Sequence, residues 1–127
     1  MLLRDLRILV VDDDPETVDT FSALLEMEGA NVAVATSARD ALRIVDEHRP
    51  QLILSDIGMP DLSGLQFIEQ VRRRNGGAEI IAIALSGYSR EEDVEAATKA
   101  GFDAHLTKPV MLDTLVMTVA RLRQRQR

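Results

Sequence analysis

The chain has 127 residues, a length that suits one domain, and 46% of them are hydrophobic against 28% charged, as in ordinary globular proteins. Its 15 basic and 21 acidic residues give a net charge of −6, which argues against direct binding of nucleic acid or of anionic membranes. Because the chain has no Cys, disulfides, thiolate metal sites and thiol catalysis are excluded. No apolar run approaches the ~20 residues of a membrane span, and we expect a cytoplasmic protein.

Short apolar segments alternate along the chain with stretches of helical spacing. The segments expected to form strands are, in chain order, Ile8–Val11, Val32–Ala35, Leu52–Leu54, Ile80–Leu85 and Ala104–Leu106. The first, third and fourth are continuously apolar, which is typical of strands covered on both faces. Apolar residues spaced three or four apart predict helices around residues 18–25, 41–45, 65–71, 94–100 and 112–122.

Turn and capping residues separate these elements. Asp14-Pro15 predicts a helix start, and Gly29 and Gly101 stand where a helix would end in a left-handed residue. The cluster at residues 75–77, Asn-Gly-Gly, predicts a turn before the fourth strand. Strict alternation of strand and helix predicts an α/β fold with a parallel sheet and helices on both faces. In such sheets, ligands bind at the carboxyl ends of the strands.

Polar residues follow four of the expected strands. They are Asp12-Asp13-Asp14, Asp56, Ser86-Gly87 and Thr107-Lys108-Pro109. Each set alone would consist of ordinary loop residues, but all four sets are expected at one edge of the sheet. Three carboxylates brought together there would repel one another unless a cation is present, and oxygen ligands without His or Cys favour Mg²⁺.

This set of residue types suits phosphoryl transfer. A divalent ion can hold a phosphoryl donor, and one carboxylate can attack phosphorus to form an acyl phosphate. Lys108 offers a positive charge for the phosphoryl oxygens, and Ser86 offers a hydroxyl donor.

The sequence resembles the receiver domain of two-component response regulators over about residues 7–122. The shared motifs are Ile8-Leu9-Val10-Val11-Asp12-Asp13-Asp14, Ser55-Asp56-Ile57-Gly58-Met59-Pro60-Asp61-Leu62-Ser63-Gly64, Ala84-Leu85-Ser86-Gly87 and Lys108-Pro109. The resemblance implies a flavodoxin-like (βα)5 three-layer sandwich with a five-stranded parallel sheet in the order 2-1-3-4-5. It also implies one receiver domain over residues 1–127, with a core of about 7–122 and a basic tail at 123–127.

The resemblance assigns a role to each matching residue of the acidic edge. Asp56 matches the phosphoacceptor. Asp12 and Asp13 match the acidic pair that binds Mg²⁺, together with the Asp56 carboxylate and the backbone carbonyl of Gly58.

The remaining matches concern switching. Ser86 holds the switch hydroxyl position, where threonine is more frequent, and Lys108 the position of the phosphate-sensing lysine. His105 stands where the family usually has an aromatic switch residue, either as a strand histidine or as a smaller switch. The Lys108–Pro109 bond is typically cis in this family.

The resemblance also implies partners. A histidine kinase or a histidine phosphotransfer protein would donate the phosphoryl group, and a homodimer would form through the fourth helix, fifth strand and fifth helix. Such a domain is a signalling module rather than an enzyme, although it assists its own phosphorylation and dephosphorylation. The domain could be a stand-alone receiver, a domain of a hybrid histidine kinase or the receiver of a longer regulator, and the sequences of residues 56–60 and 104–109 are most similar to receivers of hybrid histidine kinases.

Other functions remain as alternatives. A small hydrolase of the haloacid dehalogenase type would use Asp12 as its nucleophile, but Glu16 stands where that motif needs Thr or Val. A receiver-like interaction module would never be phosphorylated, although here every functional position is filled. Flavin or dinucleotide binding would need a glycine-rich phosphate loop, and the loop after the first strand is acidic instead.

Overall fold

The computed structural model describes residues 3–87 and 90–124. The elements in chain order are β1 Arg7–Val11, α1 Pro15–Met27, β2 Asn31–Ala35, α2 Ala38–His48, β3 Leu52–Asp56, α3 Gly64–Arg73, the short 3₁₀ helix η1 Gly77–Glu79, β4 Ile81–Ser86, α4 Glu91–Ala100, β5 Ala104–Thr107 and α5 Leu112–Gln124. All five expected strands and all five expected helices are present. Residues 125–127 of the expected basic tail lie outside the described residues.

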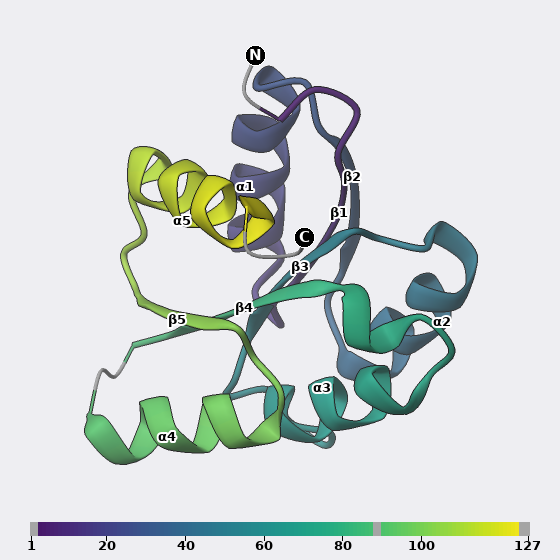
Figure 1. Ribbon diagram of the computed structural model, residues 1–127, viewed down its shortest axis with the longest axis vertical. Coiled ribbons are helices and arrows are strands. Elements are labelled where there is room, and N and C mark those ends of the chain that lie inside the picture. Colours follow the sequence, from purple (N-terminus) through teal and green to yellow (C-terminus); the bar gives the residue numbers. More distant parts are fainter. Residues whose placement is uncertain (1–2, 88–89, 125–127) are drawn as a thin grey trace.

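The strands form one parallel sheet in the order β2-β1-β3-β4-β5 (Figure 1). This order confirms the flavodoxin-like arrangement expected from the sequence. In the register, Val11 at the end of β1 lies opposite Ser55, and Ser86 at the end of β4 lies opposite Thr107. The carboxyl ends of β1, β3, β4 and β5 therefore meet along one edge.

Three strands run further than their apolar residues predicted. β3 ends at Asp56 instead of Leu54, β4 at Ser86, and β5 at Thr107. Backbone pairing continues through these polar residues because it depends on the neighbouring strand and not on the side chain; Asp56, for example, pairs with Leu85. The acidic and hydroxyl side chains are thus fixed by the sheet itself.

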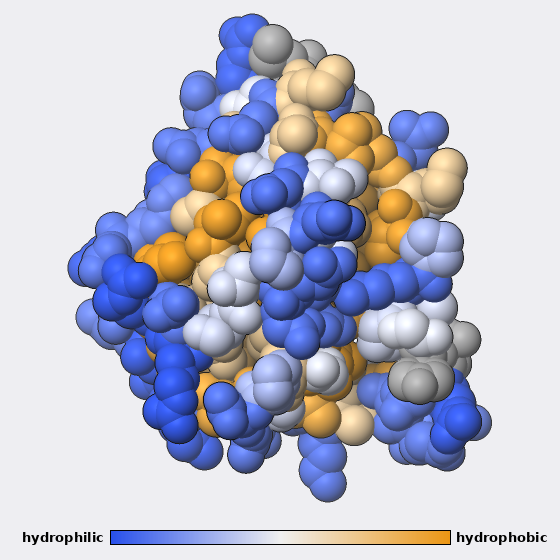
Figure 2. Space-filling view, turned by 180° about the vertical axis from the view of Figure 1, so that it is seen from behind, coloured by the Kyte–Doolittle hydropathy of each residue, from blue (hydrophilic) through white to orange (hydrophobic). Residues whose placement is uncertain are grey.

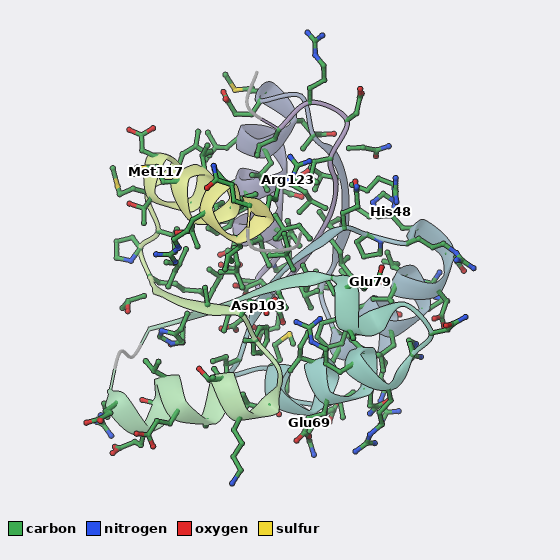
Figure 3. The ribbon with its side chains drawn as sticks, in the orientation of Figure 1. His48, Glu69, Glu79, Asp103, Met117 and Arg123 are labelled. Atoms are coloured by element: carbon green, nitrogen blue, oxygen red, sulfur yellow. The ribbon has the colours of Figure 1, made fainter. Side chains whose placement is uncertain are left out.

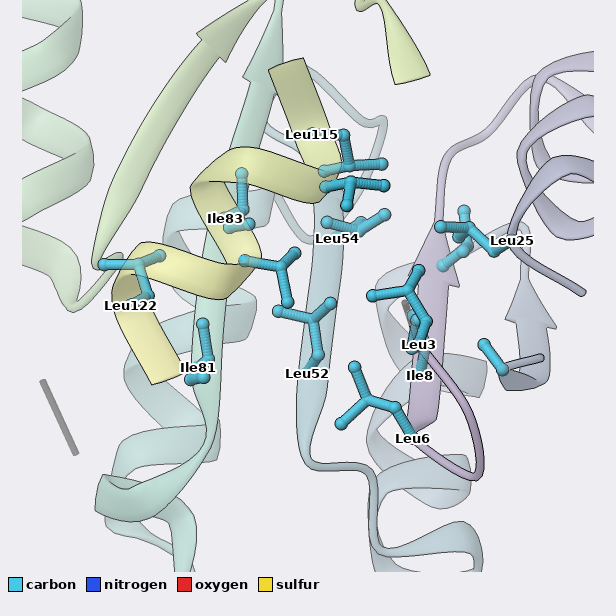
Figure 4. Close-up of a cluster of buried hydrophobic side chains, with 14 of the residues drawn as sticks. Leu3, Leu6, Ile8, Leu25, Leu52, Leu54, Ile81, Ile83, Leu115 and Leu122 are labelled. Carbon is cyan, nitrogen blue, oxygen red and sulfur yellow. The ribbon is translucent and has the colours of Figure 1, made fainter. Parts of the chain in front are cut away.

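Two apolar layers hold helices to the two faces of the sheet. In Figure 1, α1 and α5 lie on one side of the sheet, at the upper left, and α2, α3 and α4 lie on the other side, at the right and the bottom. On the first face, Leu25 of α1 and Leu115 of α5 are fully buried against Ile8, Leu52 and Ile83 (Figure 4). The opposite layer is centred on Phe67 of α3. Fully burying one such side chain contributes about 1.5–3 kcal/mol.

Capping side chains determine where α1 and α3 begin near the carboxyl edge of the sheet. Asp14 is the N-cap of α1, where its side chain accepts a hydrogen bond from the backbone N–H of Glu16, and Pro15 follows at the first helical position. Ser63 and Gln66 form a reciprocal capping box at the start of α3. Both helices therefore begin a few residues after the carboxyl ends of β1 and β3.

The surface is polar with small apolar areas. Figure 2 shows hydrophilic residues over much of the rear face, with hydrophobic residues between them. Large apolar side chains that are exposed among the described residues are Met27, Val34, Met111 and Met117. Met117 points outward from α5 (Figure 3). Within residues 3–87 and 90–124, every helix is too short or too polar to cross a bilayer.

Candidate functional site

Three aspartates gather at the carboxyl edge of the sheet. Asp12 and Asp13 follow β1 directly, and Asp56 ends the neighbouring strand β3. One carboxylate oxygen from each lies within 4.8 Å of the others. The parallel pairing of β1 and β3 brings these residues together although 43 or more positions separate them in the chain.

Asp12 is the most deeply placed of the three. It is 2% exposed, and its two carboxylate oxygens accept hydrogen bonds from different donors. The backbone N–H of Asp14 donates to Oδ1 at 3.0 Å, and the Lys108 ammonium donates to Oδ2 at 2.8 Å. Asp13, in contrast, is exposed. The cluster therefore has one anchored carboxylate and one that faces solvent.

Lys108 bridges two of the carboxylates. Its Nζ lies 2.8 Å from Asp12 Oδ2 and 3.4 Å from Asp56 Oδ1, so the closer partner is Asp12. Lys108 reaches this place from the loop after β5, where its backbone N–H donates to the carbonyl of Ser86 at 2.7 Å. The Lys108–Pro109 peptide bond is cis.

The environment shifts the pKa values of the central pair. Burial is the main cause that raises the pKa of Asp56, and the negative charges of Asp12 and Asp13 add to it, while Lys108 opposes the shift. Burial also acts to lower the pKa of Lys108, but the hydrogen bond that its ammonium donates to Asp12 and the charges of Asp56 and Asp12 outweigh burial and raise that pKa. Each group of the pair therefore tends to hold its proton.

The residues present fit a hard divalent cation. Three carboxylates converge within 4.8 Å, and one ammonium pairs with two of them, so the cluster keeps an excess of negative charge. The donor atoms are all oxygens, which Mg²⁺ prefers over nitrogen or sulfur. Gly58 follows Asp56 by two residues, and its exposed backbone belongs to the loop between β3 and α3.

Ser86 and His105 are in direct contact beside this cluster. Ser86 ends β4 and is 8% exposed, and His105 lies in the edge strand β5. The distance from Ser86 Oγ to His105 Nε2 is 2.8 Å, a short hydrogen bond. The hydroxyl and the imidazole at the two predicted switch positions are therefore directly coupled.

Two glycines shape the loop after Asp56. A Cβ atom on Gly64 would overlap the backbone carbonyl oxygen of Asp56, so only glycine lets the start of α3 lie this close to β3. A Cβ on Gly58 would meet nothing within 4 Å. The start of α3 therefore packs closely against Asp56, whereas the space beside Gly58 is open.

A groove of about 890 Å³ lies at the opposite edge of the sheet. Its lining includes Arg7 at the start of β1, Gln51 before β3 and Ile80 before β4. It shares no residue with the acidic cluster. Because parallel sheets bind ligands at the carboxyl ends of their strands, we place the functional site at the cluster.

The structure brings together the residues singled out in the sequence and adds contacts that the sequence did not reveal. Asp12, Asp13, Asp56 and Lys108 form one cluster, as expected from their positions after strands. The closer pairing of Lys108 with Asp12 was not expected, because it depends on the path of the loop after β5. The hydrogen bond of His105 was also missed, because it depends on the register of β4 with β5.

Comparison with known proteins identifies the family profile that the chain matches. The Response regulator receiver domain profile matches residues 8–120. An uncharacterized 14.6 kDa protein encoded in the sodA1 3′ region of Leptolyngbya boryana is 47% identical over 108 residues, which cover 85% of this chain and 82% of that protein. The transcriptional regulatory protein PrrA of Mycobacterium tuberculosis is 36% identical over 120 residues, or 94% of this chain. The chain spans 51% of PrrA, about half its length.

Solved structures show the same fold. The chemotaxis protein CheY4 of Vibrio cholerae superposes with a TM-score of 0.88 at 27% identity and covers 92% of this chain and 98% of its own. A CheY-like response regulator receiver domain protein from Methanospirillum hungatei gives a TM-score of 0.87 at 31% identity, with 96% of both chains covered.

Proposed function

The chain belongs to the response regulator receiver domain family, and from this premise we propose that it accepts a phosphoryl group on Asp56. Receiver domains are signalling domains that interact with histidine kinases or phosphotransfer proteins. The observation that carries the proposal is the position of Asp56 at the end of β3, beside Asp12 and Asp13 and 3.4 Å from the Lys108 ammonium.

The proposed reaction is a transfer from phosphohistidine to a carboxylate. A carboxylate oxygen of Asp56 attacks phosphorus, the P–N bond of the donor breaks in line, and the electron pair of that bond goes to the imidazole, which leaves neutral because its other ring nitrogen already carries a proton. The product is an aspartyl phosphate, which water later hydrolyses. Lys108 supports the ionised form of Asp56 before transfer and neutralises the phosphoryl oxygens after it.

Asp12, Asp13, Asp56 and the carbonyl of Gly58 would hold Mg²⁺ in this reaction. When bound, the ion supplies Lewis-acid neutralisation of the phosphoryl oxygens and a template for the donor. The protein's own share is to keep Asp12 fixed through two hydrogen bonds and to leave Asp13 accessible from solvent.

Switching follows from the charge of the new group. A dianionic phosphoryl group on Asp56 attracts the Lys108 ammonium, in the loop after β5, and the Ser86 hydroxyl, at the end of β4 directly before the loop that follows it. Movement of these loops alters the surface formed by α4, β5 and α5. We assign partner docking and homodimer formation to that surface, where Met111 and Met117 are 68% and 72% exposed.

The context of the domain is also part of the proposal. Residues 1–127 would act as one receiver in the cytoplasm, with a functional core of about residues 7–122. The similarity of residues 56–60 and 104–109 to receivers of hybrid histidine kinases favours such a kinase as the parent protein over a stand-alone receiver or the receiver of a longer regulator. Phosphotransfer profiling against the kinases of the host identifies the phosphoryl donor.

The acceptor is tested by substitution. We expect acetyl phosphate with MgCl₂ to add the mass of one phosphoryl group to the wild-type protein and none to Asp56→Asn, because the amide cannot form an acyl phosphate. Intact-protein mass spectrometry measures the outcome directly.

Asp61→Asn is the matched control. Asp61 is exposed in the loop after Asp56 and has a φ of 66°, which asparagine tolerates, so this variant should be labelled like the wild type. Label that persists in Asp56→Asn but disappears in Asp12→Asn would favour the hydrolase alternative. No label on the wild type would favour the unphosphorylated interaction module.

A further inference from the structure

The hydrogen bond between Ser86 and His105 is built by the register of two strands. Ala84 lies opposite His105, and Ser86 lies opposite Thr107. Because side chains alternate along a strand, His105 projects to the same face of the sheet as Ser86. The two side chains meet with Oγ and Nε2 2.8 Å apart, and neither is fully exposed.

The direction of this hydrogen bond depends on the protonation of Nε2. A serine hydroxyl carries one proton and can also accept hydrogen bonds, whereas a phosphoryl group only accepts. If Nε2 carries no proton, Ser86 must donate its proton to His105. If Nε2 carries a proton, His105 donates to Ser86, and the hydroxyl proton is directed to another acceptor.

We propose that phosphorylation of Asp56 selects the form of His105 that is protonated on Nε2. In that state His105 donates to Ser86 Oγ, and Ser86 donates its proton to a phosphoryl oxygen. Both the neutral Nε2–H tautomer and the imidazolium ion satisfy this requirement. His105 is thus a positioning residue that acts through Ser86, and the inference rests on the proposed function of Asp56.

A side chain without a donor at this place could not act in this way. Phenylalanine would fill the space beside Ser86 but would offer its hydroxyl no hydrogen-bond donor. Glutamine offers an N–H donor and therefore preserves the proposed chain of hydrogen bonds. This difference provides a conservative variant that separates hydrogen bonding from packing.

The first test observes the ring directly in the wild-type protein. Long-range ¹H–¹⁵N correlation spectra report whether each histidine nitrogen carries a proton. The chain has two histidines, and a His105→Gln variant assigns the signals of His105. Spectra are compared in MgCl₂ before and after addition of beryllofluoride, a mimic of the phosphoryl group. We expect a protonated Nε2 in the beryllofluoride complex; an unprotonated Nε2 in that complex would overturn the inference.

The same spectra separate this inference from the proposed function. Backbone amide shifts next to Asp56 report whether beryllofluoride binds there. If these amides do not respond, the phosphoacceptor proposal fails, and the inference fails with it. If they respond while Nε2 stays unprotonated, only the inference is wrong.

A double-mutant cycle gives the functional readout. We expect His105→Phe to slow labelling of Asp56 by acetyl phosphate about two- to tenfold, the range for losing one oriented hydrogen bond, and His105→Gln to stay within about twofold of the wild type. In a Ser86→Ala background, His105→Phe should have no further effect, because His105 acts through the hydroxyl. Equal losses in both backgrounds would show that His105 contributes by packing alone.

Discussion

At the scale of single residues, the ionised form of Asp56 is costly to the folded protein. Burial and the charges of Asp12 and Asp13 raise its pKa above the ordinary value of 3.8, in spite of Lys108. The folded state therefore binds a proton at Asp56 over a pH range in which the unfolded chain has released it. By linkage, stability from this group is fully present below the unfolded pKa and is lost as the pH rises through the folded pKa.

A pH series of unfolding measurements tests whether stability falls as the pH rises. Without divalent cations, we expect the unfolding free energy of the wild type to fall relative to that of Asp56→Asn as the pH rises above about 4 and passes through the raised pKa of Asp56, because the amide does not ionise. Urea denaturation in the presence of a chelator measures both proteins. The Asp61→Asn variant should follow the wild type, and parallel curves for the wild type and Asp56→Asn would contradict the shift.

The residues of the site were predictable to different extents. The convergence of Asp12, Asp13 and Asp56 follows from polar residues at the ends of parallel strands, and the alternation of elements already implies that geometry. The pairing of Lys108 with Asp12 depends on how the loop after β5 turns back across the sheet. No local pattern encodes that turn, so the contact appears only in three dimensions.

At the scale of elements, one arginine of α3 connects that helix with η1 and with the residues that flank β4, α4 and β5. Arg72 in α3 donates from Nη1 to the carbonyls of Gly77 and Ile80 at 2.7 and 2.6 Å. Its Nε and Nη2 donate to the carbonyl of Gly101 at 2.9 and 2.7 Å, and Nη2 also contacts Asp103 at 3.0 Å. Asp103 directly precedes β5 (Figure 3). The Arg72 side chain is 19% exposed and its bonds to the three carbonyls are partly buried, whereas the Asp103 side chain is 43% exposed.

Replacing this arginine should destabilise the fold. We expect Arg72→Lys to cost about 2–4 kcal/mol, because an ammonium cannot span the same carbonyls and several acceptors lose a charged donor. Arg73→Lys, at the next and exposed position, should change stability by less than about 0.5 kcal/mol. Urea unfolding compares the two variants, and equal losses would contradict the role of Arg72.

Element types were easier to predict than the contacts between elements. Periodicity and capping residues identified the strands and helices, and Gly29 and Gly101 have the positive φ that was expected of them. The cluster at residues 75–77 was predicted as a turn, but Gly77 also begins the 3₁₀ helix η1. Three consecutive arginines occupy positions 72–74, and only the three-dimensional placement of the Arg72 acceptors, which include Gly101 and Asp103, distinguishes the first of them.

At the scale of the whole molecule, repulsion between the carboxylates of the acidic edge lowers the stability of the folded state, and a bound cation would reduce this repulsion. The net charge is −6, and three of the carboxylates converge at one point of the sheet. A ligand that binds only the folded state stabilises it by mass action. The same cluster that serves phosphoryl transfer should therefore couple the stability of the domain to Mg²⁺.

Thermal unfolding measures this coupling. At a Mg²⁺ concentration tenfold above Kd, we expect about 1.4 kcal/mol of added stability, or a Tm increase of about 5 °C for a domain of this size. NaCl of equal ionic strength should have little effect. In Asp13→Asn the Mg²⁺ response should shrink, and an unchanged response there would contradict the assigned ligand set.

The most direct measurement locates the acyl phosphate in the chain. The protein is treated with acetyl phosphate and MgCl₂, unfolded in acid and reduced with sodium borohydride, which converts an aspartyl phosphate to homoserine. Peptide mass spectrometry then reads the position of the homoserine. We predict homoserine at position 56 and nowhere else; homoserine at position 12, or at no position, would contradict the assignment of Asp56 as the phosphoacceptor.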